Sequence, residues 1–473
     1  MAWDQLELTG PHVAYITFSG FLITYALFSQ FIRNHLHISE PPLAILFGIL
    51  LGPYVLGWIT PRKWGMDDGT MQEVTRIIVG IQCFAVGIEL PKFYFKASNH
   101  WKSILLFLGP VMTFSWAVSA LFAYFIFKTS VATALIIGAC LSPTDPVLAA
   151  SVLASSHFSN RVPKRLRHLL SAESACNDGV SFPFLYIGIM SFKYASAGKS
   201  IKQWFLITVL WQCGFGITVG LIIGRIANRL LRLSQRKKYI SEPAFVVFYL
   251  LLALLSIGVG STLGSDDFLV AFGAGVGFAQ DGLVSKKLAS VPFPFIIDMI
   301  LNSGMFVFFG SIIPFREFLP SKLTPDIGIW QLSVFLLLLL LFRRLPIVLA
   351  LKGIIPDLQT YREALFCGHF GPMGVGALFL ALEASAQLEN GTSIPEKKPD
   401  PNKPLDDKQK AIFLIWPVIC FVVLGSTIVH GMSTLGISIA GHYLRPEGER
   451  ALLLGQEEDG LDDMVYENLE EED

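Results

Sequence analysis

The sequence predicts an all-α polytopic membrane protein that crosses the bilayer about thirteen times. Of its 473 residues, 53% are hydrophobic and 15% are charged, a composition too apolar for an ordinary soluble domain. The hydrophobic residues form continuous runs, whereas a membrane β-barrel would show short alternating segments. The net charge of −1 provides no basic surface, so we expect membrane lipid as a partner and no nucleic acid.

Windows of about 20 residues, the length of helix that crosses a hydrocarbon core, locate the expected spans. In chain order they are residues 12–32, 42–59, 73–90, 103–127, 131–155, 167–192, 203–230, 243–263, 266–282, 290–313, 327–354, 360–386 and 411–438. The stretch near 260–285 is the least regular, because Ser265, Asp266 and Asp267 interrupt its apolar residues. Together these spans predict a transmembrane domain over residues 12–440.

The segments outside the membrane are short. Residues 1–11 form an extracellular stub, and residues 446–473 form an acidic cytoplasmic tail that has few apolar residues and that we expect to be disordered. None of these segments is large enough for a catalytic domain. We therefore expect a protein that acts within the bilayer and is not an enzyme.

The distribution of Lys and Arg predicts the orientation. An odd number of spans places the termini on opposite sides, and the loops on the side of the C-terminus hold more Lys and Arg than the others. The positive-inside rule then places the N-terminus outside and the C-terminus in the cytoplasm. The glycosylation sequon Asn390-Gly391-Thr392 lies in the loop 387–410, which this orientation places outside.

The most informative stretch is residues 171–179, inside the sixth span. It carries Glu173 and Asp178, although one charged side chain at the membrane centre costs about 3 kcal/mol or more. Ser174 and Asp178 are four residues apart and share a helix face, with Asn177 beside them. A carboxylate, a hydroxyl and an amide on one buried face suit a small hard cation or a proton. The alternative is a polar cluster that only holds helices together.

The fifth span is interrupted by Pro143 and Pro146, which flank Thr144 and Asp145. Proline removes a backbone donor and disfavours helix in the residue before it. Such a break is tolerated in a membrane only where it is buried in protein or lines a wet cavity. Freed carbonyls near Thr144, its hydroxyl and the Asp145 carboxylate would then ligate a cation. The alternative is a proline kink in which Asp145 caps the second half-helix.

The twelfth span has a comparable break over residues 368–376, which contain one proline and four glycines. If the seventh span is a linker helix (about 203–230), both breaks fall in the fifth span of a six-span half. Matching interruptions indicate two inverted six-helix repeats, about 12–192 and about 243–438, with broken crossing helices and an ion site between the breaks. His369 in the second break is either a proton relay or a hydrogen-bonded packing residue.

Four other charged residues lie in or beside apolar segments. Asp266 and Asp267 open the ninth span and form either an approach path for cations or an N-cap with a first-turn acid. Arg343 and Arg344 interrupt an apolar run and require an anionic partner. An ion pair between Arg343 and Glu173 would satisfy both residues, and Asp298 is a weaker candidate of the same kind.

These residues suggest a mechanism in which Asp178 carries the ion, with Asp145, Thr144 and Ser174 around it. If Na⁺ and H⁺ compete for the same oxygens and only the neutralised site crosses the membrane, exchange is obligatory. The sequence has no GxxxxGK[ST] motif, so we expect ion gradients to supply the energy and no cofactor to take part. The alternatives are a cation channel, an ion-coupled solute symporter, and an intramembrane aspartyl protease with Asp178 and Asp267 as its dyad.

Four motifs resemble the monovalent cation:proton antiporter family, and within it the fungal plasma-membrane Na⁺/H⁺ antiporters. They are AESACNDG (residues 172–179), Thr144-Asp145-Pro146, Arg343-Arg344-Leu345-Pro346 and Gly368-His369-Phe370-Gly371-Pro372. The resemblance extends over the chain to about residue 440. It implies a NhaA/NhaP-like fold, a homodimer, and export of Na⁺, Li⁺ and, in many members, K⁺ in exchange for external H⁺. The associated roles are salt tolerance and pH homeostasis.

The resemblance also implies roles for individual residues in the membrane. Asp178 and Ser174 would be Na⁺ ligands, and the backbone at Thr144 would contribute a third. Asn177 and Asp145 would organise the crossing of the broken helices.

Two further pairs of residues receive roles in the same way. Glu173 and Arg343 would form the structural ion pair, as the residues themselves suggest. Asp266 and Asp267 match acids that take part in transport in fungal members, which makes them a secondary ion path.

Overall fold

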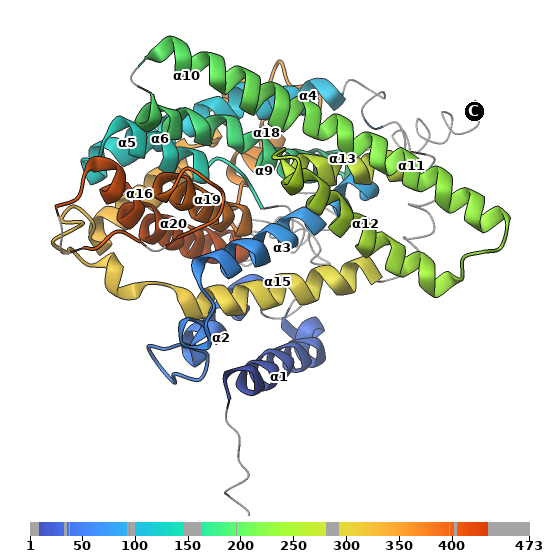
Figure 1. Cartoon of the computed structure of the whole chain (residues 1–473), viewed down its shortest axis with the longest axis horizontal. Helices are drawn as coiled ribbons and strands as arrows, with labels where there is room; N and C mark the ends of the chain where they lie inside the picture. The colour runs from blue at the N-terminus through green and yellow to red at the C-terminus, as the bar shows by residue number, and fades with distance from the viewer. Residues whose placement is uncertain are drawn as a thin grey trace, which may run out of the picture.

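The computed structural model describes residues 9–32, 36, 38–91, 94, 100–145, 162–194, 196–280, 293–396, 398–401 and 404–433. Within these residues every regular element is a helix (Figure 1). The expected tail, 446–473, and Pro146 lie outside the described residues.

The helices follow the order of the expected spans. The first half contains α1 (Gly10–Phe31), α2 (Glu40–Leu51), α3 (Asp68–Glu89), α4 (His100–Leu106), α5 (Met112–Phe127), α6 (Val131–Cys140) and α9 (Lys164–Lys193). A π-helical turn (Phe107–Val111) joins α4 to α5, and short 3-10 turns occur at Pro61–Trp64 and Phe315–Phe318. A long helix then joins the two halves of the chain, made of α10 (Ala197–Gln203), a π-helical stretch (Trp204–Phe215) and α11 (Gly216–Arg236).

The second half contains α12 (Glu242–Thr262), α13 (Asp267–Ala279), α15 (Phe293–Ile312), α16 (Ile329–Phe342), α17 (Leu345–Leu351), α18 (Tyr361–His369), α19 (Val375–Glu389) and α20 (Asp407–Gly431). Each of the thirteen expected spans thus contains one helix or consecutive helical segments, but α2 ends at Leu51 inside span 42–59, and residues 146–155 of the fifth span lie outside the described residues. The polytopic all-α fold class is confirmed, and the division into two inverted repeats stays a prediction.

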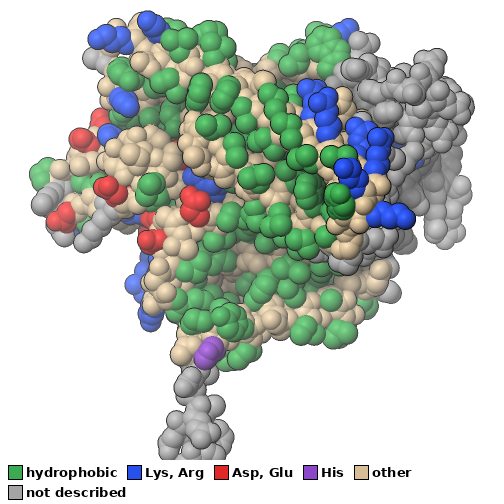
Figure 2. Space-filling view, turned by 45° about the vertical axis from the view of Figure 1, so that its right-hand side comes forward, with side chains coloured by type: hydrophobic (Ala, Val, Ile, Leu, Met, Phe, Trp, Pro, Cys, Tyr) green, Lys and Arg blue, Asp and Glu red, His purple; other side chains and the backbone are tan. Residues whose placement is uncertain are grey.

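Six described helices are long and apolar enough to cross a membrane, and five shorter apolar helices accompany them. In the apolar windows of α3 and α20, 72% and 67% of the residues are buried, against 17% in α1. The first two are therefore central, whereas α1 presents most of its apolar side chains outward. Figure 2 shows hydrophobic side chains over the middle of one face and charged side chains toward its margins, the distribution expected of a surface in contact with lipid.

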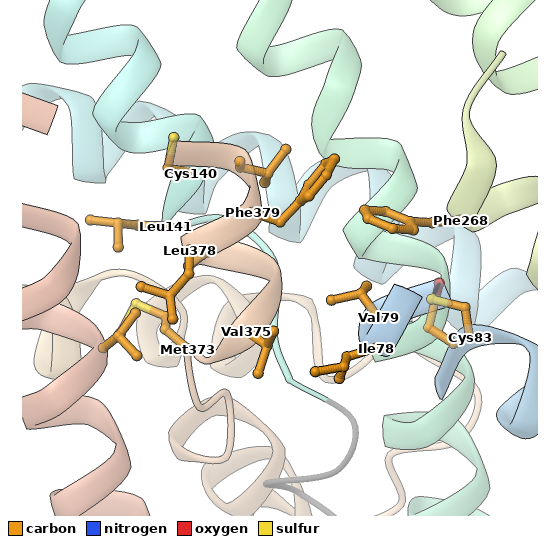
Figure 3. Close-up of a cluster of buried hydrophobic side chains, with 14 of the residues drawn as sticks. Ile78, Val79, Cys83, Cys140, Leu141, Phe268, Met373, Val375, Leu378 and Phe379 are labelled. Carbon is orange, nitrogen blue, oxygen red and sulfur yellow. Dashed lines mark hydrogen bonds between the residues drawn. The ribbon is translucent and has the colours of Figure 1, made fainter. Parts of the chain in front are cut away.

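The helices around the candidate site pack in two groups, and α2 packs separately against α15. The α6/α19 group contains α5, α6, α9, α16, α19 and α20, and the α3/α13 group contains α3, α11, α12 and α13. Contacts of α19 with α3 and of α9 with α13 join the groups. Figure 3 shows the apolar part of this junction, where α3, α13 and α19 contribute Ile78, Val79, Cys83, Phe268, Val375, Leu378 and Phe379.

Glycines set the distance between α11 and α13. A Cβ at Gly220 would overlap the carbonyl of Val270, and one at Gly224 would overlap the carbonyl of Ala274. Small residues let membrane helices approach until their backbones touch, which is where van der Waals packing between such helices is strongest. This contact fixes α13, whose first residues reach the candidate site.

We predict that Gly220→Leu lowers the stability of the detergent-solubilised protein by about 1–3 kcal/mol, because the added side chain forces α11 away from α13. A thermal melt followed by size-exclusion chromatography measures the loss. Gly258→Leu is the matched control, since a side chain there meets nothing within 4 Å. Equal melting temperatures for the two variants would contradict the proposed role of Gly220.

Candidate functional site

The two interrupted segments cross each other. Helix α6 ends at Cys140, and the segment before α19 is not helical. The Asp145 backbone N–H donates to the Pro372 carbonyl at 2.8 Å, and the Val375 N–H donates to Asp145 Oδ2 at 3.0 Å. Asp145 therefore occupies the N-terminus of α19. The expected capping role is present, but the helix that Asp145 caps belongs to the other half of the chain.

Asn177 of α9 links the site helix to this crossing. Its Oδ1 accepts from the Thr144 N–H at 3.1 Å, while its Nδ2 donates to Thr144 Oγ1 at 2.8 Å and to Glu173 Oε1 at 3.2 Å. Ser174 Oγ lies 2.8 Å from Thr144 Oγ1. A break in the fifth span and one face of the sixth span thus form a single polar cluster.

Asp178 lies in this cluster with 2% of its surface exposed. No described residue donates a hydrogen bond to its carboxylate, although most buried carboxylates are paired. It lies against Gly376 in the first turn of α19, where a methyl group would overlap Oδ1. The glycine allows close approach, and the positive end of the α19 dipole favours an anion at this position.

The resulting set of oxygens suits a hard monovalent ion. Asp178 supplies a carboxylate, Ser174 supplies a hydroxyl one turn away on the same helix, and Thr144 supplies a second hydroxyl 2.8 Å from that of Ser174. Among the described residues, no group of three or more His, Cys, Asp or Glu side chains is placed to hold a metal ion. Asp178 with the two hydroxyls supplies one negative charge, which matches the charge of Na⁺ or H⁺ better than that of a divalent cation. The carboxylates of Asp145 and Asp266 lie within electrostatic range of Asp178.

The expected ion pair between Glu173 and Arg343 is wrong, because a different arginine pairs with Glu173. Arg344 makes the pair, with Nη1 2.6 Å from Oε1 and Nη2 2.6 Å from Oε2 of Glu173. Arg343 instead donates to the carbonyls of Leu141 and Gly371.

The reason is local geometry. The two arginines are adjacent at the break between α16 and α17, so their side chains point in different directions. Arg344 reaches Glu173 on α9. Arg343 reaches backbone carbonyls that the two interruptions leave without helical donors. The side chain of Asp298, the weaker candidate partner, lies outside the described part of the structure.

Asp266 and Asp267 have different environments. Asp266 Oδ1 caps α13, accepting from the N–H groups of Phe268 and Leu269 at 3.0 and 3.1 Å. The N-cap alternative is therefore confirmed for Asp266. Asp267 Oδ2 accepts from Arg76 Nη1 at 2.6 Å and from Ser261 Oγ at 2.9 Å.

The position of Asp266 also bears on the site. Its Oδ2 is buried without a hydrogen-bond partner among the described residues and faces Gly179 of α9. The carboxylates of Asp266 and Asp178 are close enough to interact electrostatically. Asp267, by contrast, is held in an ion pair with Arg76. This pairing does not suit the alternative in which Asp267 and Asp178 form the dyad of an aspartyl protease.

The sequence analysis missed a second set of polar residues. Arg76 and Glu383 lie within the expected spans 73–90 and 360–386, and Glu383 is 1% exposed. The rule that singled out Glu173, a charge inside an apolar span, identifies both. His369 is exposed, and its Nε2 lies 3.3 Å from Ser433 Oγ; a role as a proton relay is untested.

Comparisons with known proteins point in one direction. A family profile described as the transmembrane sodium/hydrogen exchanger matches residues 19–438. The chain is 41% identical over 462 residues to Na⁺/H⁺ antiporter 2 of Zygosaccharomyces rouxii, covering 96% of this chain and 56% of that protein. It is 40% identical over 447 residues to a Na⁺/H⁺ antiporter of Saccharomyces cerevisiae, covering 93% and 45%.

The chain therefore spans about half the length of these curated relatives. It matches a Na⁺/H⁺ antiporter of Schizosaccharomyces pombe more completely, at 36% identity over 440 residues, covering 92% of this chain and 91% of that protein. The fold is similar to that of a sodium/proton antiporter of Methanocaldococcus jannaschii. That comparison has a TM-score of 0.64 at 19% identity and covers 89% of this chain and all of the other.

A double-mutant cycle tests the assignment of the ion pair. We predict strong coupling between Glu173→Gln and Arg344→Leu, and severalfold weaker coupling between Glu173→Gln and Arg343→Leu. Glu173→Gln alone should cost about 3–5 kcal/mol of stability, because it leaves a buried guanidinium without its carboxylate. Asp68→Asn, which removes a surface pair with Arg62, is the control and should cost no more than about 1 kcal/mol. Stronger coupling to Arg343 would contradict the structure.

Proposed function

The chain belongs to the sodium/hydrogen exchanger family, and on that premise we propose that it exchanges cytosolic Na⁺ for external H⁺ at Asp178. The observation that carries this proposal is a buried carboxylate, at the crossing of two interrupted helices, to which no described residue donates a hydrogen bond. The names of the relatives support the exchange of these two ions, and they are names of antiporters rather than of proteases.

The chemistry of the site accounts for the coupling. An uncompensated carboxylate is costly to move through a medium of low dielectric constant. Either Na⁺, held by Asp178 with the oxygens of Ser174 and Thr144, or a proton on Asp178 removes that charge. Because Na⁺ and H⁺ compete for the same site, the site carries Na⁺ in one direction and H⁺ in the other. The ion gradients then supply the energy for transport.

We propose four finer features on the same basis. Li⁺ follows Na⁺ because hydroxyl and carboxylate oxygens favour small hard cations, and K⁺ is a further candidate substrate. The protein acts as a homodimer in the plasma membrane, with its N-terminus outside and its C-terminus in the cytoplasm. Asp145 and Asn177 maintain the crossing, whereas Asp266 and Asp267 line a secondary ion path. In the cell the activity would serve salt tolerance and pH homeostasis.

A flux assay on the full chain in proteoliposomes tests the proposal. At a clamped membrane voltage, a Na⁺ pulse should alkalinise acid-loaded vesicles that contain the unmodified protein. Asp178→Asn should reduce this flux at least about 100-fold, because an amide neither carries the negative charge that holds Na⁺ nor takes up a proton. The protein should still fold and reach the membrane.

Asp326→Asn, at a surface ion pair with Lys128, is the control and should keep the full rate. Normal exchange by Asp178→Asn would show that the site is assigned to the wrong residue. A Na⁺ current without proton movement would favour a channel instead.

A further inference from the structure

Glu383 lies on the same face of α19 as Gly376, the residue in contact with Asp178. The two positions are seven residues apart, which is two helical turns or about 10 Å along the axis. Glu383 is therefore the next acid that α19 presents beyond the site, in the direction of the loop over residues 390–406. It is 1% exposed.

Four neutral groups hold the Glu383 carboxylate. Gln72 Nε2 of α3 donates to Oε2 at 2.7 Å. Oε1 accepts from Gln387 Nε2 at 3.0 Å, from Ser393 Oγ at 2.7 Å and from the Tyr186 hydroxyl of α9 at 3.5 Å. Gln387 and Ser393 are half-buried, so the carboxylate is connected to the molecular surface through them.

Arg76 does not neutralise this acid. Arg76 is within electrostatic range of Glu383, but its Nη1 is bonded to Asp267 and Ser261 and its guanidinium lies 5.1 Å from the centre of the Phe379 ring. Two buried acids share one arginine. The cluster therefore keeps an excess negative charge, which attracts cations in a medium of low dielectric constant.

A polar route connects this acid to Asp178. The Gln212 side chain lies close enough to the Tyr186 hydroxyl to interact with it, and the Gln212 backbone carbonyl accepts from the Asp266 N–H at 3.2 Å. Asp266 in turn faces Gly179, next to Asp178. The route thus runs from the loop 390–406 through Glu383, Tyr186, Gln212 and Asp266 to the site.

Buried oxygens with unused lone pairs line the same route. Three such atoms have no hydrogen-bond partner among the described residues: Gln72 Oε1, Gln212 Oε1 and Asp266 Oδ2. Amide and carboxylate oxygens are the groups that replace the hydration shell of a hard cation. Gln72 Oε1 belongs to the same amide that contacts Glu383, so it adds a neutral ligand beside the acid.

We propose that Glu383 is a second cation-binding residue of the transport path, which with Gln72 receives the ion between Asp178 and the side that carries the loop 390–406. This inference rests on the proposed exchange of Na⁺ for H⁺. It assigns Glu383 a role in binding the transported ion, and Tyr186 a positioning role that aligns Glu383 with Gln212.

Side-specific kinetics test the assignment. The full chain is expressed, and Na⁺-driven proton flux is measured in membrane vesicles of both orientations, with Na⁺ added on one side at a time. Glu383→Gln should raise the apparent KM for Na⁺ about tenfold when Na⁺ is added on the side of the loop 390–406, because one attracting charge is lost. From the opposite side the KM should change by less than about twofold, since the oxygens around Asp178 are unaltered.

Two further variants keep the test decisive. Glu389→Gln, the same chemical change later in α19, should leave both KM values unchanged. Tyr186→Phe, which keeps the ring and removes the hydroxyl, should raise the KM on the same side by about threefold, as loss of one long hydrogen bond of 3.5 Å predicts. This variant serves if Glu383→Gln does not reach the membrane.

Unchanged KM values in these variants, or an equal rise from both sides, would overturn the role of Glu383 while exchange by the unmodified protein continued. Absence of exchange in the unmodified protein would instead overturn the proposed function, and this inference with it.

Discussion

The architecture depends on satisfying main-chain groups at two interruptions that cross inside the protein. Each interruption leaves carbonyl and N–H groups without helical partners, in a region where water is not available to replace them. Arg343 donates to a carbonyl of each broken segment, Asp145 accepts from the first N–H of α19, and Asn177 accepts from the Thr144 N–H. These three side chains hold the two halves of the chain in one crossing. The position of the Thr144 hydroxyl beside Ser174 follows from that crossing.

Around the crossing, some buried acids are paired with arginine, and others have no arginine partner among the described residues. Glu173 is engaged by Arg344 through two hydrogen bonds, and Asp267 is engaged by Arg76. No arginine among the described residues pairs with Asp178, which lies against Gly376 of α19. In a medium of low dielectric constant, an unpaired acid of this kind is stable only with a cation or a proton on it. The same difference in pairing distinguishes Glu383 from Asp267.

Sequence patterns were sufficient for the features that depend on local chemistry. Continuous apolar runs predicted the helices, and Pro143, Pro372 and the surrounding glycines predicted both interruptions. Spacing along α9 placed Ser174, Asn177 and Asp178 on one face. The choice between Arg343 and Arg344 was not accessible in this way, because adjacent residues at a helix break diverge in a direction that only the three-dimensional packing sets. The contacts of Glu383 with Gln72 and Tyr186 join residues far apart in the chain, so hydropathy indicated a buried acid there without indicating its partners.

The central claim is that Na⁺ and H⁺ occupy one set of oxygens at Asp178. The dependence of Na⁺ transport on pH, measured with the unmodified protein in proteoliposomes at clamped voltage, tests it most directly. Competition predicts that the apparent KM for Na⁺ rises as the pH falls, while the maximal rate at saturating Na⁺ stays constant. A maximal rate that falls with pH at a constant KM would show that protons act at a different site, and would contradict the account.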